Sequence, residues 1–231
     1  MTESMGVGSL PPRRVFLAGG TGYVGSRLIP RLLARGHSVT ALARKGSEGR
    51  LPAGCAVVTG DALDETTFAD RVAPADTFVQ LIGVPHPSPA KAALFRSVDL
   101  ASAKASARAA KAAGVSHFVY VSVAQPAPAM KAYVAARAEG EAFITSLGLD
   151  ATFLRPWYVL GPGHRWPYAI LPAYWLFERL PGTRESARRL GLVTLAQMVA
   201  ALVHAVENPA TGIRIVGVPE IRGSAPIREE R

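Results

Sequence analysis

The sequence has few residues that could form disulfide bonds or bind a metal ion. It contains a single cysteine, Cys55, so an internal disulfide is impossible. No histidine and cysteine stand at the spacing of metal ligands, so we expect no metal site. These features exclude a disulfide scaffold and fit a reducing compartment best.

Long hydrophobic runs are also missing. The longest uncharged apolar stretch, Trp166–Phe177, has 12 residues, whereas a membrane-spanning helix needs roughly 18 or more. The first 12 residues contain no apolar run and resemble neither a signal peptide nor an anchor. We therefore expect a cytoplasmic protein with a flexible tail at residues 1–12.

Acidic residues are scarce relative to basic ones. There are 17 Asp and Glu against 26 Lys and Arg, and the net charge is +9. Such a balance suits an anionic partner, such as nucleic acid, acidic lipid or a phosphate-bearing cofactor. The basic residues are scattered and no basic run is interleaved with aromatics, so we read them as solvated faces and expect no nucleic-acid partner.

Apolar runs alternate with longer segments of helical period. The expected strands are Arg14–Ala18, Ser38–Leu42, Ala56–Thr59, Thr77–Leu81, His117–Val121 and Ala151–Leu154, with a short one at Ile213–Val218. The expected helices are Gly22–Arg35, Ala90–Ala113, Lys131–Leu147 and Leu195–Glu207. This order predicts an α/β doubly wound parallel sheet, a Rossmann fold, in a single domain over residues 1–231. Residues 156–231 would contribute a small C-terminal substrate cap.

A glycine-rich turn joins the first strand to the first helix. The segment Gly19–Gly25 reads Gly-Gly-Thr-Gly-Tyr-Val-Gly. Glycines at its first, fourth and seventh positions let pyrophosphate oxygens reach amides at the helix N-terminus, and let helix and strand pack closely. The alternative is an ordinary glycine-rich turn. We expect a dinucleotide to contact Gly19, Thr21, Gly22, Tyr23, Val24 and Gly25.

The end of the second strand indicates which dinucleotide binds. In such folds an acidic residue there holds the ribose hydroxyls of NAD, but this strand runs into Ala43-Arg44-Lys45. A guanidinium can grip a 2′-phosphate, so Arg44 favours NADP(H) over NAD(H). Otherwise Arg44 and Lys45 are exposed loop charges. After the third strand, Asp61 and Ala62 would contact the adenine, or Asp61 caps a helix.

Together these residues resemble the short-chain dehydrogenase/reductase superfamily, specifically its extended and atypical, epimerase-like and NmrA-like branches. The resemblance covers nearly the whole chain. It rests on Gly19–Gly25, Gly60–Asp64, Val98-Asp99, Phe118–Ser122, Tyr133–Arg137 and Leu154-Arg155-Pro156.

The resemblance implies roles for residues after later strands. Leu81, Ile82 and Gly83 would line the adenine ribose and pyrophosphate. Val121 and Ser122 would also belong to the cofactor site, and Pro156, Trp157 and Tyr158 would pass near the nicotinamide. Tyr133 would be the catalytic acid or base, or else a tyrosine packed at the cleft wall. Arg137 would bind the nicotinamide ribose and supply positive charge.

Two positions depart from the pattern of active members. Val123 stands where a serine or threonine usually hydrogen-bonds the substrate, and valine cannot donate. Arg137 replaces the lysine of the Tyr-x-x-x-Lys motif, and its bulk and fork geometry would alter the ribose contact. Ser122 could take the missing serine's role, but its position in a strand more often faces the interior.

The segment after the sixth strand would contact the substrate. Trp157, His164 and Arg165 are its candidate contacts, the latter two in a Gly/Pro loop. Residues 166–177 would pack on the domain or a second subunit, or else form an apolar pocket or a peripheral membrane contact. The chain would be a monomer or a homodimer.

The leading interpretation is an NADP(H)-dependent atypical oxidoreductase acting on an apolar carbonyl or alcohol, with a degenerate Ser-Tyr-Lys site. The alternative is a non-catalytic NADP(H)-binding sensor or accessory subunit, similar to NmrA-like regulators or the accessory subunit of respiratory complex I. Sugar-nucleotide epimerisation or dehydration is disfavoured, because the segment after Pro156 is short and apolar for such a substrate.

Overall fold

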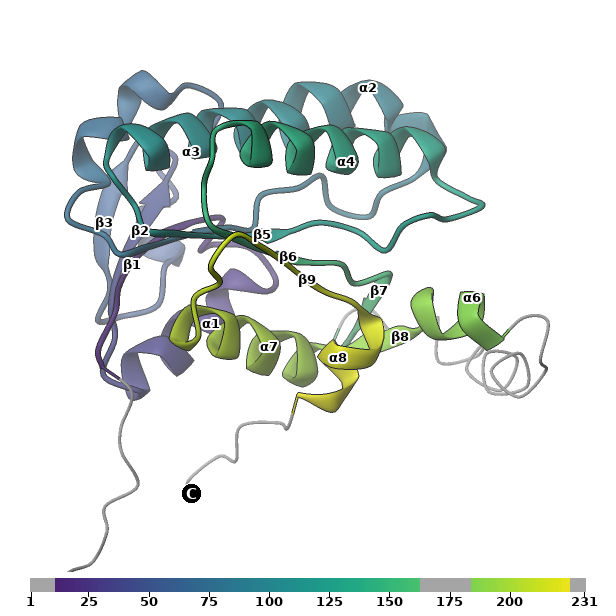
Figure 1. Cartoon of the computed structure of the whole chain (residues 1–231). Helices are drawn as coiled ribbons and strands as arrows, with labels where there is room; N and C mark the ends of the chain where they lie inside the picture. Colours follow the sequence, from purple (N-terminus) through teal and green to yellow (C-terminus); the bar gives the residue numbers. More distant parts are fainter. Residues whose placement is uncertain (1–10, 163–183, 225–231) are drawn as a thin grey trace, which may run out of the picture.

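A seven-stranded parallel sheet forms the centre of the molecule (Figure 1). The computed structural model describes residues 11–162 and 184–224. The strand order is β3-β2-β1-β4-β5-β6-β9, and every neighbouring pair is parallel. The strands are β1 (Arg14–Ala18), β2 (Ser38–Ala43), β3 (Ala56–Thr59), β4 (Thr77–Gln80), β5 (His117–Val121), β6 (Ala151–Leu154) and β9 (Ile213–Val216). Two short strands, β7 (Tyr158–Leu160) and β8 (Leu192–Thr194), pair separately.

Helices cover both faces of the sheet, as Figure 1 shows. One face carries α2 (Ala92–Leu94), α3 (Ala101–Ala112) and α4 (Lys131–Ser146), and the other carries α1 (Gly25–Ala34), α7 (Leu195–Glu207) and α8 (Val218–Gly223). The helix α6 (Arg184–Arg189) lies beside β8. The remaining turns are the 3-10 segments η1 (Glu48–Arg50), η2 (Glu65–Thr67), η3 (Ala69–Arg71) and η4 (Pro89–Lys91), and the π-helical η5 (Phe95–Leu100).

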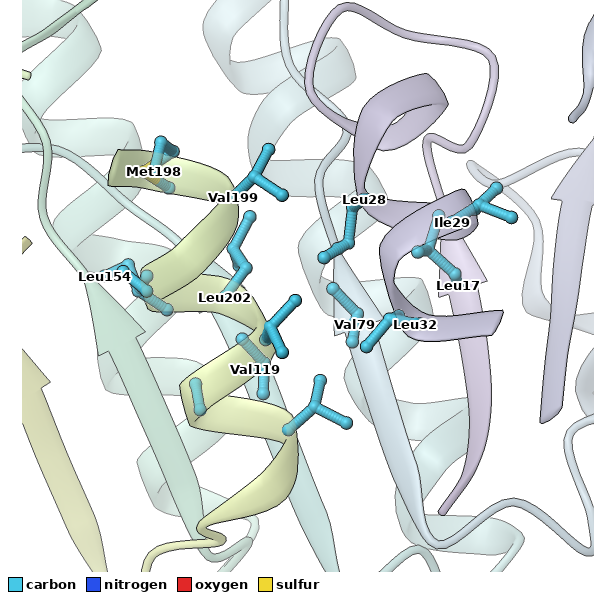
Figure 2. Close-up of a cluster of buried hydrophobic side chains, with 14 of the residues drawn as sticks. Leu17, Leu28, Ile29, Leu32, Val79, Val119, Leu154, Met198, Val199 and Leu202 are labelled. Carbon is cyan, nitrogen blue, oxygen red and sulfur yellow. The ribbon is translucent and has the colours of Figure 1, made fainter. Parts of the chain in front are cut away.

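The five central strands are buried on both faces, which explains their continuous apolar sequences, whereas the edge strands β3 and β9 are partly exposed. Side chains that alternate along the central strands enter two different cores. Figure 2 shows one of them, where Leu28 and Leu32 of α1 and Leu202 of α7 converge on the sheet. The other core is aromatic and includes the stacked rings of Phe78 and Phe118, whose centroids are 5.3 Å apart. Helices fixed on both faces leave the carboxyl ends of the strands as the edge where loops can build a site.

The doubly wound parallel sheet is confirmed, with local corrections. The predicted helix Ala90–Ala113 is wrong as a single element, because the chain passes through η4, α2 and the π-helical η5 before α3 begins. The first helix begins at Gly25 rather than Gly22, since residues 19–24 form the turn itself. The last strand ends at Val216 and joins the main sheet as its edge beside β6.

The described residues contain neither a membrane-spanning helix nor a metal-binding cluster. None of their helices combines the length and apolar character that crossing a membrane requires. Among the same residues, no three side chains of histidine, cysteine, aspartate or glutamate gather closely enough to hold a metal ion.

Candidate active site

A cleft of about 440 Å³ opens at the carboxyl ends of β1, β2, β3 and β4. This is the edge where doubly wound sheets bind ligands. Nine residues expected from the sequence line it, namely Gly19, Thr21, Gly22, Arg44, Asp61, Ala62, Leu81, Ile82 and Gly83. A larger hollow of about 740 Å³ lies among α7, β9 and α8, but the glycine turn is not part of its lining. We therefore place the candidate cofactor site in the smaller cleft.

The glycine turn approaches its neighbours closely at the positions that lack side chains, above all at Gly20 and Gly25. Gly19 adopts a φ of +94°, in the left-handed region that favours glycine, and its carbonyl accepts a hydrogen bond from the amide of Gly22. A Cβ atom on Gly25 would lie 2.3 Å from the Gly19 carbonyl oxygen. The turn thus packs tightly on the first strand and begins α1 at the mouth of the cleft, where helix amides can receive a pyrophosphate.

Arg44 lies at the rim of the cleft directly after β2, and its side chain is exposed. A turn in which the amide of Ser47 donates to the Arg44 carbonyl brings both residues to the cleft wall. The nearby carboxylate of Glu48 has its pKa lowered by the backbone amides of residues 48, 46 and 47 and by the Thr59 hydroxyl. Glu48 does not line the cleft. Arg44 is therefore the charged side chain of this loop that faces the candidate cofactor site.

Asp61 follows β3 and lines the cleft. Its carboxylate accepts a hydrogen bond from the Leu63 amide at 3.0 Å, and its own amide donates to the Thr67 hydroxyl. Asp61 thus shapes a turn, and its side chain is still exposed toward the cleft. The contact of this carboxylate with an adenine amino group stays a prediction.

Tyr133 lies on the first turns of α4, half-buried. Its ring packs against Phe95, with centroids 5.0 Å apart. Val84, which lines the cleft, packs against the same small cluster of Phe95 and Ala136. The guanidinium carbon of Arg137 lies 5.3 Å from the Tyr133 ring centroid. The structure therefore brings Tyr133 and Arg137 together beside the loop that follows β4.

Arg137 is almost completely buried, with 4% of its surface exposed. Its guanidinium forms an ion pair with Asp99 at 2.6 Å and donates to the carbonyl of Val121 at 2.8 Å. Burial by itself would lower the pKa of Arg137, but Tyr133, Tyr120 and Asp99 together hold that pKa above its ordinary value. The side chain is therefore a permanent buried cation. Its expected ribose contact stays a prediction.

The hydroxyl of Ser122 lies at the end of β5, where strand alternation places it on the same face as Tyr120 and α4. Ser122 is 2% exposed, and its oxygen has no hydrogen-bond partner among the described residues. Val123 is equally buried. The Ser122 hydroxyl is thus enclosed by the protein and does not line the cleft. Its use in place of the missing serine stays a prediction.

The residues after β6 continue away from the sheet. Pro156 is buried, and its carbonyl accepts a hydrogen bond from the amide of Ala124, which extends the pairing of β5 with β6. Trp157 packs on the core shared by α1 and α7, and Tyr158 begins β7. The predicted substrate contacts His164 and Arg165, and the segment 166–177, lie outside the described residues.

Sequence reasoning missed several parts of the cleft. Its walls also include Leu42, Ala43, Ser47, Gly60, Leu63, Val84, Pro85, Leu94 and Val98. Leu63 and Leu94 are large apolar side chains left 43% and 44% exposed, which is a signal that only coordinates reveal. The role of Asp99 as partner of Arg137 was missed as well, because 38 residues separate the two.

Comparison with known proteins agrees with this geometry. Residues 19–173 match a family described as NAD(P)H-binding. The chain belongs to this NAD(P)H-binding family. Because the matched region contains the glycine turn, the cleft walls and the helix with Tyr133, the family assignment covers the whole candidate site.

Relatives of this NAD(P)H-binding protein include reductases. It is 31% identical to a 3-diazoavenalumate denitrifying reductase of a Streptomyces species, a match covering 86% of this chain and 74% of the relative. It is 26% identical to ceramide reductase of Caulobacter vibrioides, of which the match spans 62%. Family, fold and relatives together support an oxidoreductase of the atypical short-chain dehydrogenase/reductase type.

Solved structures show the same fold. The enzyme WbmH of Bordetella bronchiseptica, in complex with NAD⁺, superposes with a TM-score of 0.66 at 21% identity. The alignment covers 92% of this chain and 80% of that one. At this level of identity the likeness shows a shared fold.

Proposed function

We propose that this protein uses NADP(H) to reduce or oxidise an apolar carbonyl or alcohol. The observation that carries the proposal is the glycine-walled cleft, which has Arg44 at the rim near β2 and Tyr133 beside the loop after β4. An arginine where NAD-specific folds place a carboxylate supports the phosphorylated cofactor. Tyr133 packs on the same cluster as Val84 of the cleft wall, which supports it as the proton donor.

The nicotinamide, when bound, supplies or accepts a hydride. In the reducing direction, the Tyr133 hydroxyl would donate its proton to the oxygen of the substrate carbonyl as that carbonyl is reduced to an alcohol. The buried cation of Arg137, close to the Tyr133 ring, stabilises the negative charge that develops on the tyrosine oxygen.

The proposed substrate class rests on the relatives and on the residues after β6. One relative is named for the reduction of ceramide, a lipid, which supports an apolar substrate. Trp157 lies beside the continuation of β6, where a substrate would approach the nicotinamide. The functional test is NADPH consumption by the purified protein with a panel of hydrophobic ketones, aldehydes and quinones.

Replacing Arg44 with alanine should weaken NADPH binding on the order of ten- to a hundredfold, because a charge-assisted contact to the 2′-phosphate is lost. NADH, which has no such phosphate, should bind about equally to both proteins. Titration of the two reduced cofactors by fluorescence measures this difference. Arg50→Ala is the matched control, since Arg50 is exposed on the same loop but does not line the cleft. Equal loss for NADH and NADPH would contradict the assignment.

Replacing Tyr133 with phenylalanine should lower turnover by about 10²- to 10⁴-fold, because the proton donor is removed. NADPH affinity should change little, since the ring and its packing on Phe95 remain. Steady-state kinetics and NADPH titration of the same preparations separate the two effects. Tight NADPH binding by the unaltered protein without turnover of any panel member would favour a non-catalytic module, to which the replacement of serine by Val123 also points.

A further inference from the structure

The contacts of Arg137 tie together four elements at the carboxyl edge of the sheet. Its side chain extends from α4 to Asp99 of η5, to the carbonyl of Ile82 after β4 at 3.3 Å, and to the carbonyl of Val121 at the end of β5. The second carboxylate oxygen of Asp99 accepts the amide of Val84 at 3.0 Å. One buried ion pair therefore holds both ends of the loop 82–84, which lines the cleft.

Gly83 makes this arrangement sterically possible. A Cβ atom on Gly83 would lie 2.2 Å from a terminal nitrogen of Arg137 and 3.2 Å from a carboxylate oxygen of Asp99. The backbone of Gly83 thus lies directly against the ion pair, while the residue also forms part of the cleft wall. A side chain at position 83 would therefore force the guanidinium of Arg137 to shift from its present contacts.

The π-helical turn explains how Asp99 reaches its partner. The segment Phe95–Leu100 buries Asp99 completely while Val98 lines the cleft. π-Helical turns occur often at functional sites. The two terminal nitrogens of Arg137 are occupied by Asp99, Ile82 and Val121, and its Nε atom is buried without a hydrogen-bond partner among the described residues. The terminal nitrogens are therefore engaged by the protein itself.

We propose that Asp99, Arg137 and Gly83 form a clamp that positions the loop 82–84 for the cofactor, and that Arg137 is a positioning residue instead of a ribose ligand. Asp99 is separated from the cleft and acts on the cofactor through Arg137 and the Val84 amide. The proposal rests on the proposed function only in placing the cofactor in this cleft.

Coupling between positions 83 and 137 tests the clamp in the full chain, with NADPH affinity and urea unfolding measured together. Gly83→Ala should raise the NADPH dissociation constant on the order of tenfold, because the new methyl group displaces the guanidinium. In an Arg137→Lys background, the same Gly83→Ala change should raise the NADPH dissociation constant only about two- to threefold. Lysine lacks the forked nitrogens that the methyl group would meet. An equal rise of the NADPH dissociation constant in both backgrounds would overturn the proposal.

Asp99→Asn provides a second test that preserves side-chain shape, should Gly83→Ala fail to fold. The folded variant should bind NADPH about tenfold more weakly, because the buried guanidinium loses its counter-ion. Glu139→Gln is the control, since Glu139 of α4 also forms an ion pair, with Lys104 of α3, but its side chain is 38% exposed; the NADPH affinity of this variant should be unchanged. Unaltered NADPH affinity in folded Asp99→Asn would overturn the clamp.

These outcomes are separate from those of the proposed function. If the unaltered protein binds NADPH but turns over no substrate, the oxidoreductase proposal fails and the clamp is still judged by binding. If it binds neither NADPH nor NADH, the clamp as a cofactor-positioning device is overturned too.

Discussion

Gly25→Ala should abolish measurable NADPH binding, with an expected loss of about a hundredfold or more. The added methyl carbon would meet the Gly19 carbonyl oxygen at 2.3 Å and the Gly20 Cα at 2.8 Å. Both atoms belong to backbone, so the turn itself must move. Overpacking of this kind should also lower the free energy of unfolding by about 1–3 kcal/mol. NADPH titration and urea unfolding of the folded variant measure the two effects.

Gly49→Ala is the matched control for this prediction. Gly49 lies in η1, its φ is not in the left-handed region, and a Cβ atom there would meet nothing within 4 Å. The control should keep both NADPH affinity and stability close to those of the unaltered protein. A Gly25→Ala variant that binds NADPH normally would show that the close approach of helix and strand is not required for the cofactor.

Acidification should destabilise the protein through His117, which is completely buried at the start of β5. Burial, assisted by the charges of Arg214 and Arg13 and opposed by Asp150, lowers the pKa of His117 from 6.5 to about 4. The unfolded chain therefore takes up a proton at a higher pH than the folded protein. Stability is fully present above pH 6.5 and falls as the pH drops toward 4, by about 3 kcal/mol from this residue alone.

Urea unfolding at pH 7.5 and pH 4.5 measures this loss against His117→Gln. Glutamine can retain a hydrogen bond to Thr152, whose hydroxyl lies 2.9 Å from the histidine ring nitrogen, but it does not titrate. The exposed carboxylates are the same in both proteins, so the difference between the two pH dependences isolates His117. Parallel loss of stability in the two proteins would refute a buried neutral histidine.

The sequence was most informative where one short segment holds all the necessary parts. The glycine turn needs only a strand, seven residues and a helix. Nine of the expected residues line one cleft, whereas Tyr23, Val24 and Gly25 do not, and the cofactor contacts themselves stay predictions. The position after β2 can also be recognised from neighbouring residues, so the sequence identified Arg44 as a candidate cofactor contact by its position alone. The structure places its side chain at the cleft as expected.

Prediction was weaker where partners are distant in sequence. The helix expected over Ala90–Ala113 contains a π-helical turn, because Asp99 bonds to Arg137 and to the Val84 amide instead of following a regular helix register. No pattern among the residues near Asp99 in the sequence indicates these distant partners. The placement of β9 beside β6 likewise depends on long-range pairing between Ile213–Val216 and Ala151–Leu154.

The amino-acid sequence by itself determined that this chain forms a doubly wound sheet with a dinucleotide turn at Gly19–Gly25, since apolar periodicity and glycine geometry act over neighbouring residues. Only the tertiary structure revealed which groups contact the arginine in the lysine position. Burial forces a charge to find a counter-ion and hydrogen bonds, and folding supplies them from Asp99, Ile82 and Val121. The same side chain that sequence alone assigns to a ribose is thereby engaged by the protein's own loops.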